Sequence, residues 1–182
     1  VRRICDERGA LLIIDEIQTG FGRTGKMFAI DHYGVSPDLL TCAKSLAGGV
    51  PMGAVLISEK VGNIVPGMHG STFGGNPLSC AAANAALAVI EEEDLPGQAA
   101  EKGKYLIEKL EQIDSPKIRE VRGLGLMVGI ELKEKAMPYI QALMERNIIA
   151  LNAGMTVIRF LPPLVITYAQ LDHLVEVLTE VL

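Results

Sequence analysis

The sequence predicts an α/β protein, in which a mostly parallel sheet is covered by helices and is followed by a smaller α+β domain. Continuous apolar runs at residues 10–14 and 39–43 end abruptly in polar residues, as strands do when a parallel sheet is covered on both faces. Of the 182 residues, 49% are hydrophobic but only 4% are aromatic, a composition that suits closely packed helices and sheets.

A boundary between two domains is predicted just before residue 95. The acidic run 91–94 is followed by the helix breakers Pro96 and Gly97. We therefore expect one domain at 1–94 and a second at 95–182.

Charge, length and cysteine usage exclude several classes of function. The net charge of −5, with no stripe of Lys and Arg, argues against nucleic-acid binding. No apolar run reaches the roughly 20 residues that span a bilayer, which argues against a membrane protein. Cys5, Cys42 and Cys80 lie far apart without metal-ligand spacing, so we expect free thiols, no metal site and a cytoplasmic location. The chain begins without Met in an apparent helix tail that stops at Gly9, so we expect the later part of a longer polypeptide.

The first domain is predicted to alternate strands with loops and helices. Apolar runs predict the strands, and clusters of glycine predict the loops. Capping residues or periodic apolar residues predict the helices. Asn76 and Pro77 make a good N-cap and first turn. The helix after them is rich in Ser, Cys and Ala, so we expect it to be buried, with a subunit interface as one explanation. The expected elements are strand 10–14, ordered surface loop 20–25, short helix 26–33, strand 39–43, strand 52–58, helix 59–65, polar loop 66–76 and helix 77–94.

The second domain is predicted to be a compact α+β unit. Its helices show apolar residues three and four positions apart, and Thr167 with Gln170 forms a capping box before the last of them. The expected elements are helix 98–113, strand-like 118–132, helix 136–146, strands 148–151 and 156–160, and the C-terminal helix.

Two polar residues follow neighbouring strands of the predicted sheet. Asp15 comes directly after the run 10–14, and Lys44 ends the run 39–43 beneath the glycine pair Gly48 and Gly49. The carboxyl ends of strands in open α/β sheets face the ligand crevice. A lysine held nearly dry at such an end could attack a carbonyl. The alternatives are a helix cap or solvated turn at Asp15 and a solvated strand cap at Lys44.

Two further features complete a set with these residues. The polar loop carries Ser71 and Thr72, beside a His69 that we interpret as an ordinary loop residue, and Arg159 is a cation inside an apolar run. The alternative interpretation of Arg159 is a side chain that faces solvent from an edge strand. Together the set suits pyridoxal 5'-phosphate, which needs a lysine for its aldehyde, a carboxylate for its ring nitrogen and hydroxyls for its phosphate. An arginine fork suits the carboxylate of an amino-acid substrate.

Four stretches, in the same order, resemble class III aminotransferases, and the resemblance covers nearly the whole chain. The last stretch is similar to the acetylornithine aminotransferase branch, including its relatives in lysine biosynthesis. The stretches are Leu11–Gly25 (LLIIDEIQTGFGRTG), Ala43–Lys44 with Gly48–Gly49, His69–Leu78 (HGSTFGGNPL), and Leu151–Gly154 with Val157–Leu164. The resemblance implies part of the large domain of a fold-type I pyridoxal-phosphate-dependent transferase, followed by its small C-terminal domain.

The resemblance also implies roles by position. Lys44 would carry the cofactor and act as the catalytic base and acid, while Asp15 would pair with the ring nitrogen and Gln18 with the ring hydroxyl. Ser71 would lie near the substrate, and Arg159 would bind the substrate α-carboxylate.

Three more site residues follow from the same resemblance. Glu16 and Ile17 belong to the cofactor-binding segment, and Thr72 would reach the phosphate of the neighbouring subunit in a homodimer.

The implied activity is transfer of an amino group from N-acetylornithine, or from a related N-acylated diamino acid such as carrier-bound lysine, to 2-oxoglutarate. The products are a semialdehyde and glutamate, in arginine or lysine biosynthesis. Alternatives are 4-aminobutyrate or ornithine aminotransferase, a racemase or aminomutase with the same cofactor, and a non-catalytic fragment of the family. Family members carry an earlier half that supplies a phosphate-binding turn, an aromatic stacked on the ring and an acid that gates Arg159. We therefore expect an incomplete sheet and no full activity of this chain alone.

Overall fold

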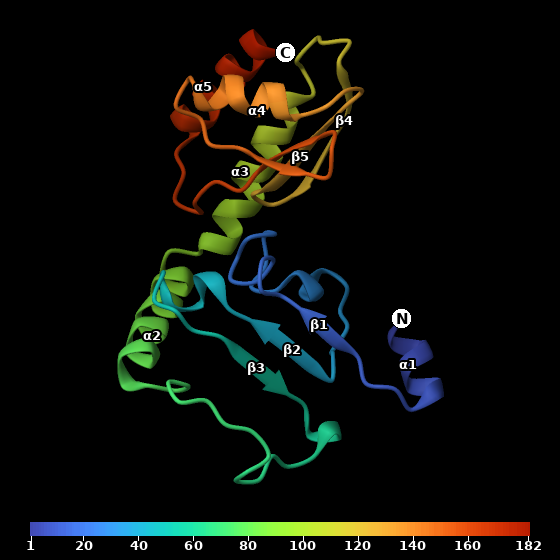
Figure 1. Ribbon diagram of the computed structural model, residues 1–182, viewed down its shortest axis with the longest axis vertical. Helices are drawn as coiled ribbons and strands as arrows, with labels where there is room; N and C mark the ends of the chain where they lie inside the picture. The colour runs from blue at the N-terminus through green and yellow to red at the C-terminus, as the bar shows by residue number, and fades with distance from the viewer. The chain divides into compact units, whose positions relative to one another are not determined.

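The computed structural model describes residues 1–182, which form two compact units (Figure 1). Unit 1 comprises residues 1–22 and 26–94, and unit 2 comprises residues 23–25 and 95–182. A three-residue segment from the first part of the sequence therefore belongs to the second unit.

Unit 1 is built on a three-stranded sheet in the order β1-β2-β3. Strands β1 (Ile13–Asp15) and β2 (Leu39–Cys42) are parallel, whereas β3 (Ala54–Ile57) runs antiparallel to β2, as the arrowheads in Figure 1 show. Before the sheet, helix α1 (Arg2–Arg8) ends at Gly9, whose φ of 63° is the left-handed conformation of a helix C-cap. The mixed arrangement of helices and strands confirms the α/β class.

The other helical elements of unit 1 are short, except for one. The helices expected at 26–33 and 59–65 are reduced to the 3₁₀ turns η1 (Ala29–His32) and η3 (Glu59–Val61). A third turn, η2 (Lys44–Ala47), follows β2 directly, and helix α2 (Pro77–Glu92) closes the unit. The N-cap at Asn76 is confirmed, because its side-chain oxygen accepts a hydrogen bond of 3.0 Å from the Ser79 N–H.

Two expectations about burial in unit 1 are not met within this chain. The strand at 10–14 is not covered on both faces, since Ile13 is 59% exposed and Leu11 is 47% exposed. Helix α2 buries only Ser79, Ala83 and Ile90. The reason is that β1 packs mainly against β2, and α2 packs mainly against η2.

The start of the sheet is tied together by Asp38, a buried carboxylate just before β2. It accepts hydrogen bonds from the Leu12 N–H at 2.7 Å and from Arg2 at 2.8 Å, and Lys60 lies 3.4 Å away. The backbone hydrogen bond, followed by the contact with Arg2, lowers the pKa of Asp38 to about 2. This network joins α1, β1 and the loop before β2.

Unit 2 is an antiparallel sheet with three helices. Its sheet has the order β4-β5-β7-β6, and every neighbouring pair is antiparallel. The strand-like segment expected at 118–132 is a hairpin that turns at Gly125, with a φ of 54°. The elements in chain order are α3 (Leu95–Leu110), β4 (Ile118–Leu124), β5 (Met127–Leu132), α4 (Met137–Met144), β6 (Leu151–Ala153), β7 (Val157–Phe160) and α5 (Tyr168–Val181).

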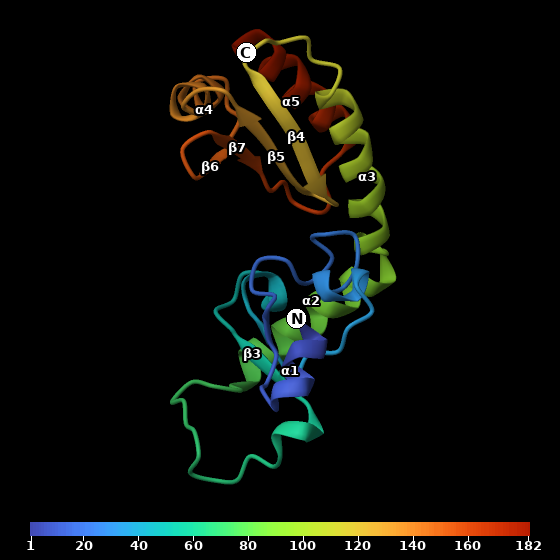
Figure 2. The same cartoon turned by 90° about the vertical axis from the view of Figure 1, so that its right-hand side faces the viewer.

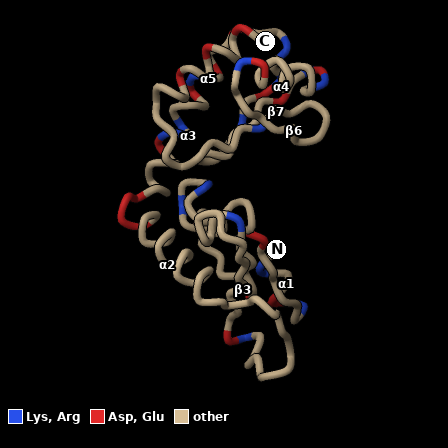
Figure 3. Tube along the Cα trace, turned by 60° about the vertical axis from the view of Figure 1, so that its left-hand side comes forward, with Lys and Arg blue, Asp and Glu red and all other residues tan.

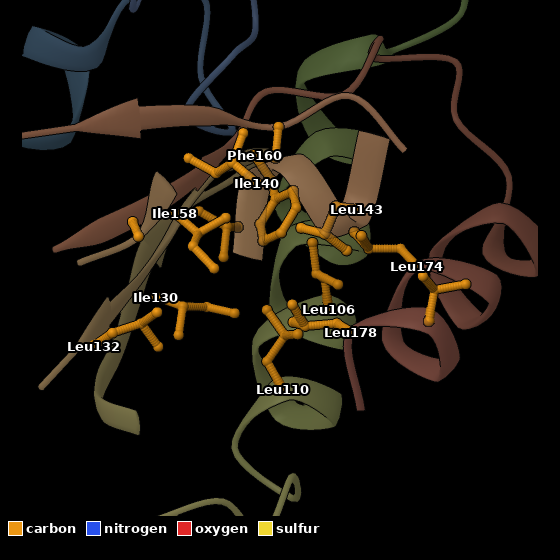
Figure 4. Close-up of a cluster of buried hydrophobic side chains, with 14 of the residues drawn as sticks. Leu106, Leu110, Ile130, Leu132, Ile140, Leu143, Ile158, Phe160, Leu174 and Leu178 are labelled. Carbon is orange, nitrogen blue, oxygen red and sulfur yellow. The ribbon is translucent and has the colours of Figure 1, made fainter. Parts of the chain in front are cut away.

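One face of this sheet forms the core of unit 2 (Figures 2 and 4). Alternate residues of β5 and β7 point inward against the helices, as the period of a strand requires, and the opposite face carries Glu131 and Arg159 among smaller and apolar residues. The capping box of Thr167 and Gln170 before α5 is confirmed. The central side chains with no exposed surface are Leu106, Leu110, Ile130, Leu132, Leu143, Ile158, Leu171 and Leu178.

Two general expectations can be compared with the structure. The thiols of Cys5, Cys42 and Cys80 are all free, as expected. No helix of the structure is both long and apolar enough to cross a lipid bilayer.

Candidate active site

Asp15 and Lys44 lie at the same end of two adjacent parallel strands. In the β1–β2 ladder Asp15 pairs with Thr41, and the Glu16 N–H donates to the Thr41 oxygen at 2.8 Å. Lys44 follows shortly after Thr41, at the first position of η2. The parallel pairing therefore brings the carboxylate and the amine to one edge of the sheet, where ligands of open α/β sheets bind.

Lys44 has an unusual backbone conformation. Its φ is 46°, in the left-handed region that costs a non-glycine residue energy and that clusters at functional sites. The Lys44 side chain is exposed, so the expectation of a nearly dry amine is not met within this chain. Gly48 and Gly49, with φ values of 60° and 107°, shape the turn that follows η2.

The carboxylate of Asp15 is exposed and forms no ion pair. It accepts one hydrogen bond of 2.9 Å from the Ile17 N–H, which orients it at the end of β1. The side chains of Ile17 and Gln18 are half-buried in the same segment.

Glu16 points the other way and is almost fully buried, with 1% of its surface exposed. Its carboxylate accepts the N–H groups of Ala29 at 3.0 Å and Ile30 at 2.8 Å, and it also accepts the Thr19 hydroxyl. The two N–H groups belong to the first turn of η1, where backbone donors have no partner within the turn and so bind an anion. Glu16 therefore closes the loop that connects β1 to η1.

Ser71 and Thr72 lie in an exposed loop before α2. Ser71 lines a hollow of about 220 Å³ in unit 1, together with Phe73 and Asn76. The side chain of Asn76 donates to the Phe73 oxygen at 3.0 Å, so the N-cap of α2 also anchors the end of this loop.

Arg159 belongs to unit 2, on β7. It pairs with Gly129 of β5 and with Leu151 of β6, and its neighbours Ile158 and Phe160 point into the core. Arg159 therefore lies on the outer face of the sheet.

The loop 20–25 departs from the expected surface loop. Phe21 is 4% exposed and Thr24 is 3% exposed, so most of the glycine-rich segment is packed. A Cβ added at Gly25 would lie 2.9 Å from the Ala100 Cβ, a distance that only glycine tolerates. Sequence patterns did not reveal the packing of this loop or the role of Asp38, since each depends on a partner far away in the chain.

The residues at the sheet edge suit pyridoxal 5'-phosphate. Asp15 offers a carboxylate without a cationic partner, and the Lys44 Nζ forms no hydrogen bond or ion pair. A group with an aldehyde and a protonated ring nitrogen needs an amine and an anion of this kind, and the exposed hydroxyls of Ser71 and Thr72 are suited to a phosphate.

The family model described as "Aminotransferase class-III" matches residues 1–182. The chain belongs to this family. The match confirms the resemblance to class III aminotransferases. Because members of this family depend on pyridoxal 5'-phosphate, it also confirms the expected cofactor.

Curated relatives give the same assignment. The chain is 56% identical over its whole length to a "[LysW]-aminoadipate semialdehyde transaminase" of Deinococcus radiodurans, and it covers 43% of that protein. It is 52% identical to "Ornithine aminotransferase 2" of Staphylococcus aureus, again over all of this chain and 46% of that protein. The chain thus spans less than half the length of these relatives.

Solved structures confirm the fold. An ornithine aminotransferase of Plasmodium yoelii is 38% identical with a TM-score of 0.92, over 99% of this chain and 50% of that one. An acetylornithine aminotransferase of Elizabethkingia anophelis is 39% identical with a TM-score of 0.91, over 98% of this chain and 49% of that one. The fold is therefore that of part of a pyridoxal-phosphate-dependent aminotransferase.

Proposed function

We propose that the complete polypeptide carrying this chain is an aminotransferase that moves an amino group from a diamino acid to 2-oxoglutarate. The observation that carries the proposal is the pairing of β1 with β2, which puts Asp15 and Lys44 at one sheet edge. Unit 1 would be the C-terminal half of the cofactor-binding large domain, and unit 2 would be the small domain.

Each site residue has a distinct task in this proposal. The cofactor, when bound, supplies an aromatic ring that accepts the electrons of a substrate carbanion. Asp15 keeps the proton on the ring nitrogen and Gln18 orients the ring hydroxyl, while Ile17 borders the ring. Lys44 would hold the cofactor through its aldehyde, and the Lys44 amine would serve as the base that takes a proton from the substrate carbon and as the acid that returns it.

The remaining residues bind the outer parts of the ligands. Thr72 donates to a phosphate oxygen across a homodimer interface, and Ser71 contacts the substrate. Arg159 binds the substrate α-carboxylate through two parallel hydrogen bonds. A dimer is supported by α2, whose turns from Pro77 to Ile90 carry no charged residue (Figure 3) and leave the apolar side chains of Leu78 and Val89 exposed. The proposed location is the cytoplasm.

N-acylated diamino acids are the proposed donors, in arginine or lysine biosynthesis. The support is the similarity to the transaminase of D. radiodurans and to the acetylornithine aminotransferase of E. anophelis. Ornithine itself is the second candidate, favoured by the 52% identity to the S. aureus protein. Glutamate formation from ornithine, N-acetylornithine and 4-aminobutyrate, measured side by side, separates these donors and distinguishes transfer from racemisation.

Replacement of Lys44 tests the assignment. In the full-length protein, Lys44→Ala should lower turnover by at least about 10²- to 10⁴-fold, the usual contribution of a positioned base. Borohydride reduction of the cofactor-loaded wild type should leave the phosphopyridoxyl mass on the Lys44 peptide. Lys135→Ala, on an exposed residue, is the control. Near-normal turnover of Lys44→Ala, or the label on another lysine, would refute the assignment.

A further inference from the structure

The ladder between β5 and β7 stops for a chemical reason. Val128 pairs with Phe160 in this antiparallel pair, so the same register would place Leu126 opposite Pro162. Proline has no N–H, and a ladder rung at this position would lack its donor. The Leu126 carbonyl therefore needs a donor from elsewhere. So does the Pro162 carbonyl, because the Leu126 N–H donates to the Arg23 oxygen instead.

Arg23 supplies that donor. Its Nη1 donates to the Leu126 oxygen at 3.0 Å and to the Pro162 oxygen at 2.5 Å. The backbone of Arg23 takes part as well, since its carbonyl accepts the Leu126 N–H at 3.0 Å. The side chain and backbone of Arg23 thus replace the rung that Pro162 cannot form.

The segment around Arg23 is partly buried and packs closely against the turn before β5. Arg23 forms no ion pair with a carboxylate, and burial lowers its pKa, although a guanidinium stays charged in proteins. A Cβ added at Gly125 would lie 2.6 Å from the Arg23 oxygen, so the turn before β5 approaches the segment as closely as glycine allows.

A second cation holds the chain just beyond. The Lys102 Nζ, in a residue that is only 7% exposed, donates to the Leu164 oxygen at 3.3 Å and to the Gln98 side chain at 3.0 Å. The backbone after β7 is therefore held by Arg23 and Lys102. Both cations donate to carbonyl oxygens of this segment, and neither has an acidic partner.

Arg159 depends on this arrangement, because it lies on β7 shortly before Pro162. β7 runs from Val157 to Phe160, and its other neighbour β6 spans Leu151–Ala153. Strands this short are held by few rungs, so the direction of the Arg159 side chain depends on how firmly the end of β7 is fixed.

We propose that Arg23 is a positioning residue for Arg159: it completes the end of the β5–β7 ladder and so aims the Arg159 guanidinium at the substrate α-carboxylate. This inference rests on the proposed function, in which Arg159 binds that carboxylate. Arg23 itself does not touch the substrate in this account.

The test compares substrates with and without the α-carboxylate. The full-length, cofactor-loaded enzyme and its Arg23→Gln, Arg23→Lys and Arg159→Gln variants are assayed with the better of ornithine and N-acetylornithine. The same variants are assayed with the matching amine that lacks the α-carboxylate, 1,4-diaminobutane or its N-acetyl form. Arg23→Gln should lower kcat/KM for the amino acid by at least about tenfold through KM, because small misplacements of a binding group cost this much. The value for the amine should stay within about twofold, and Arg23→Lys should recover part of the loss.

Hydrogen exchange provides an independent readout. Amides at the end of the ladder, near Val128 and Phe160, should exchange faster in Arg23→Gln than in wild type. Arg146→Gln is the matched control, because Arg146 also donates to a backbone oxygen, that of Ala142 at 3.1 Å, but this contact lies four positions back at the end of α4 and not at the β5–β7 ladder.

Each outcome decides the question. Equal losses for both substrates, or unchanged kinetics and exchange, overturn the role of Arg23 whenever Arg159→Gln remains selective for the carboxylate. If Arg159→Gln loses no selectivity, the proposed function of Arg159 is wrong, and the inference falls with it. If Arg23→Gln does not fold, Arg23→Lys decides by the same comparison.

Discussion

Replacement of Glu16 by Gln is expected to open the loop between β1 and η1. The Glu16 carboxylate accepts two backbone N–H groups, from Ala29 and Ile30, and the Thr19 hydroxyl. A glutamine of the same size has one acceptor oxygen, and its NH₂ group would face a buried N–H. One donor of η1 would then have no acceptor.

The size of the effect follows from these contacts. A buried donor left without a partner costs about 1–3 kcal/mol, and bonds to charged groups lie at the upper end. We expect local opening of the loop to become easier by about 2 kcal/mol, which corresponds to a roughly thirtyfold larger open population. Amide hydrogen exchange of Ala29 and Ile30, measured by NMR on the 182-residue chain, reports this population directly.

The control is Glu91→Gln, which makes the same chemical change at an exposed position of α2. Exchange at Ala29 and Ile30 should be unchanged in this control. If Glu16→Gln also leaves both amides as protected as in wild type, the carboxylate does not hold the loop. In the full-length enzyme, the same variant should weaken cofactor binding, because Asp15 and Gln18 are anchored on either side of Glu16.

Two more predictions concern stability. Gly103→Ala places a Cβ 2.0 Å from the Gly125 oxygen, so its melting temperature should fall by an amount equivalent to about 3 kcal/mol or more, whereas Gly70→Ala, in open space, should melt as wild type. Contact with the Leu12 N–H and Arg2 depresses the pKa of Asp38 to about 2, so its contribution is fully present above pH ~4 and is lost as the pH falls through about 2. Acid titration of unfolding should therefore be flatter over this range in Asp38→Asn, and an unchanged slope would contradict the role of Asp38.

Local patterns predicted the parts of the fold that depend on neighbouring residues. Caps at Asn76 and Thr167 and the C-cap at Gly9 were found because each motif lies within a few positions of its partner. The joint placement of Asp15 and Lys44 was predicted by a topological rule, since both follow strands that a parallel pairing aligns. Burial was predicted less well, because the same apolar pattern describes a covered strand and a strand such as β1.

Residues that act across long separations could not be found in this way. Arg23 and Pro162 are 139 positions apart, and neither carries a local signal: one lies in a glycine-rich loop and the other in a proline pair. The lack of an N–H at Pro162 matters only because the register of β5 and β7 places this residue opposite Leu126. The need for a donor from Arg23 therefore cannot be recognised before that register is known. The same holds for Gly25, whose lack of a side chain matters because it packs against Ala100. Motifs thus identify the groups that react, whereas the groups that aim them emerge from strand register, so substitutions at Arg23 test the three-dimensional arrangement independently of the motifs.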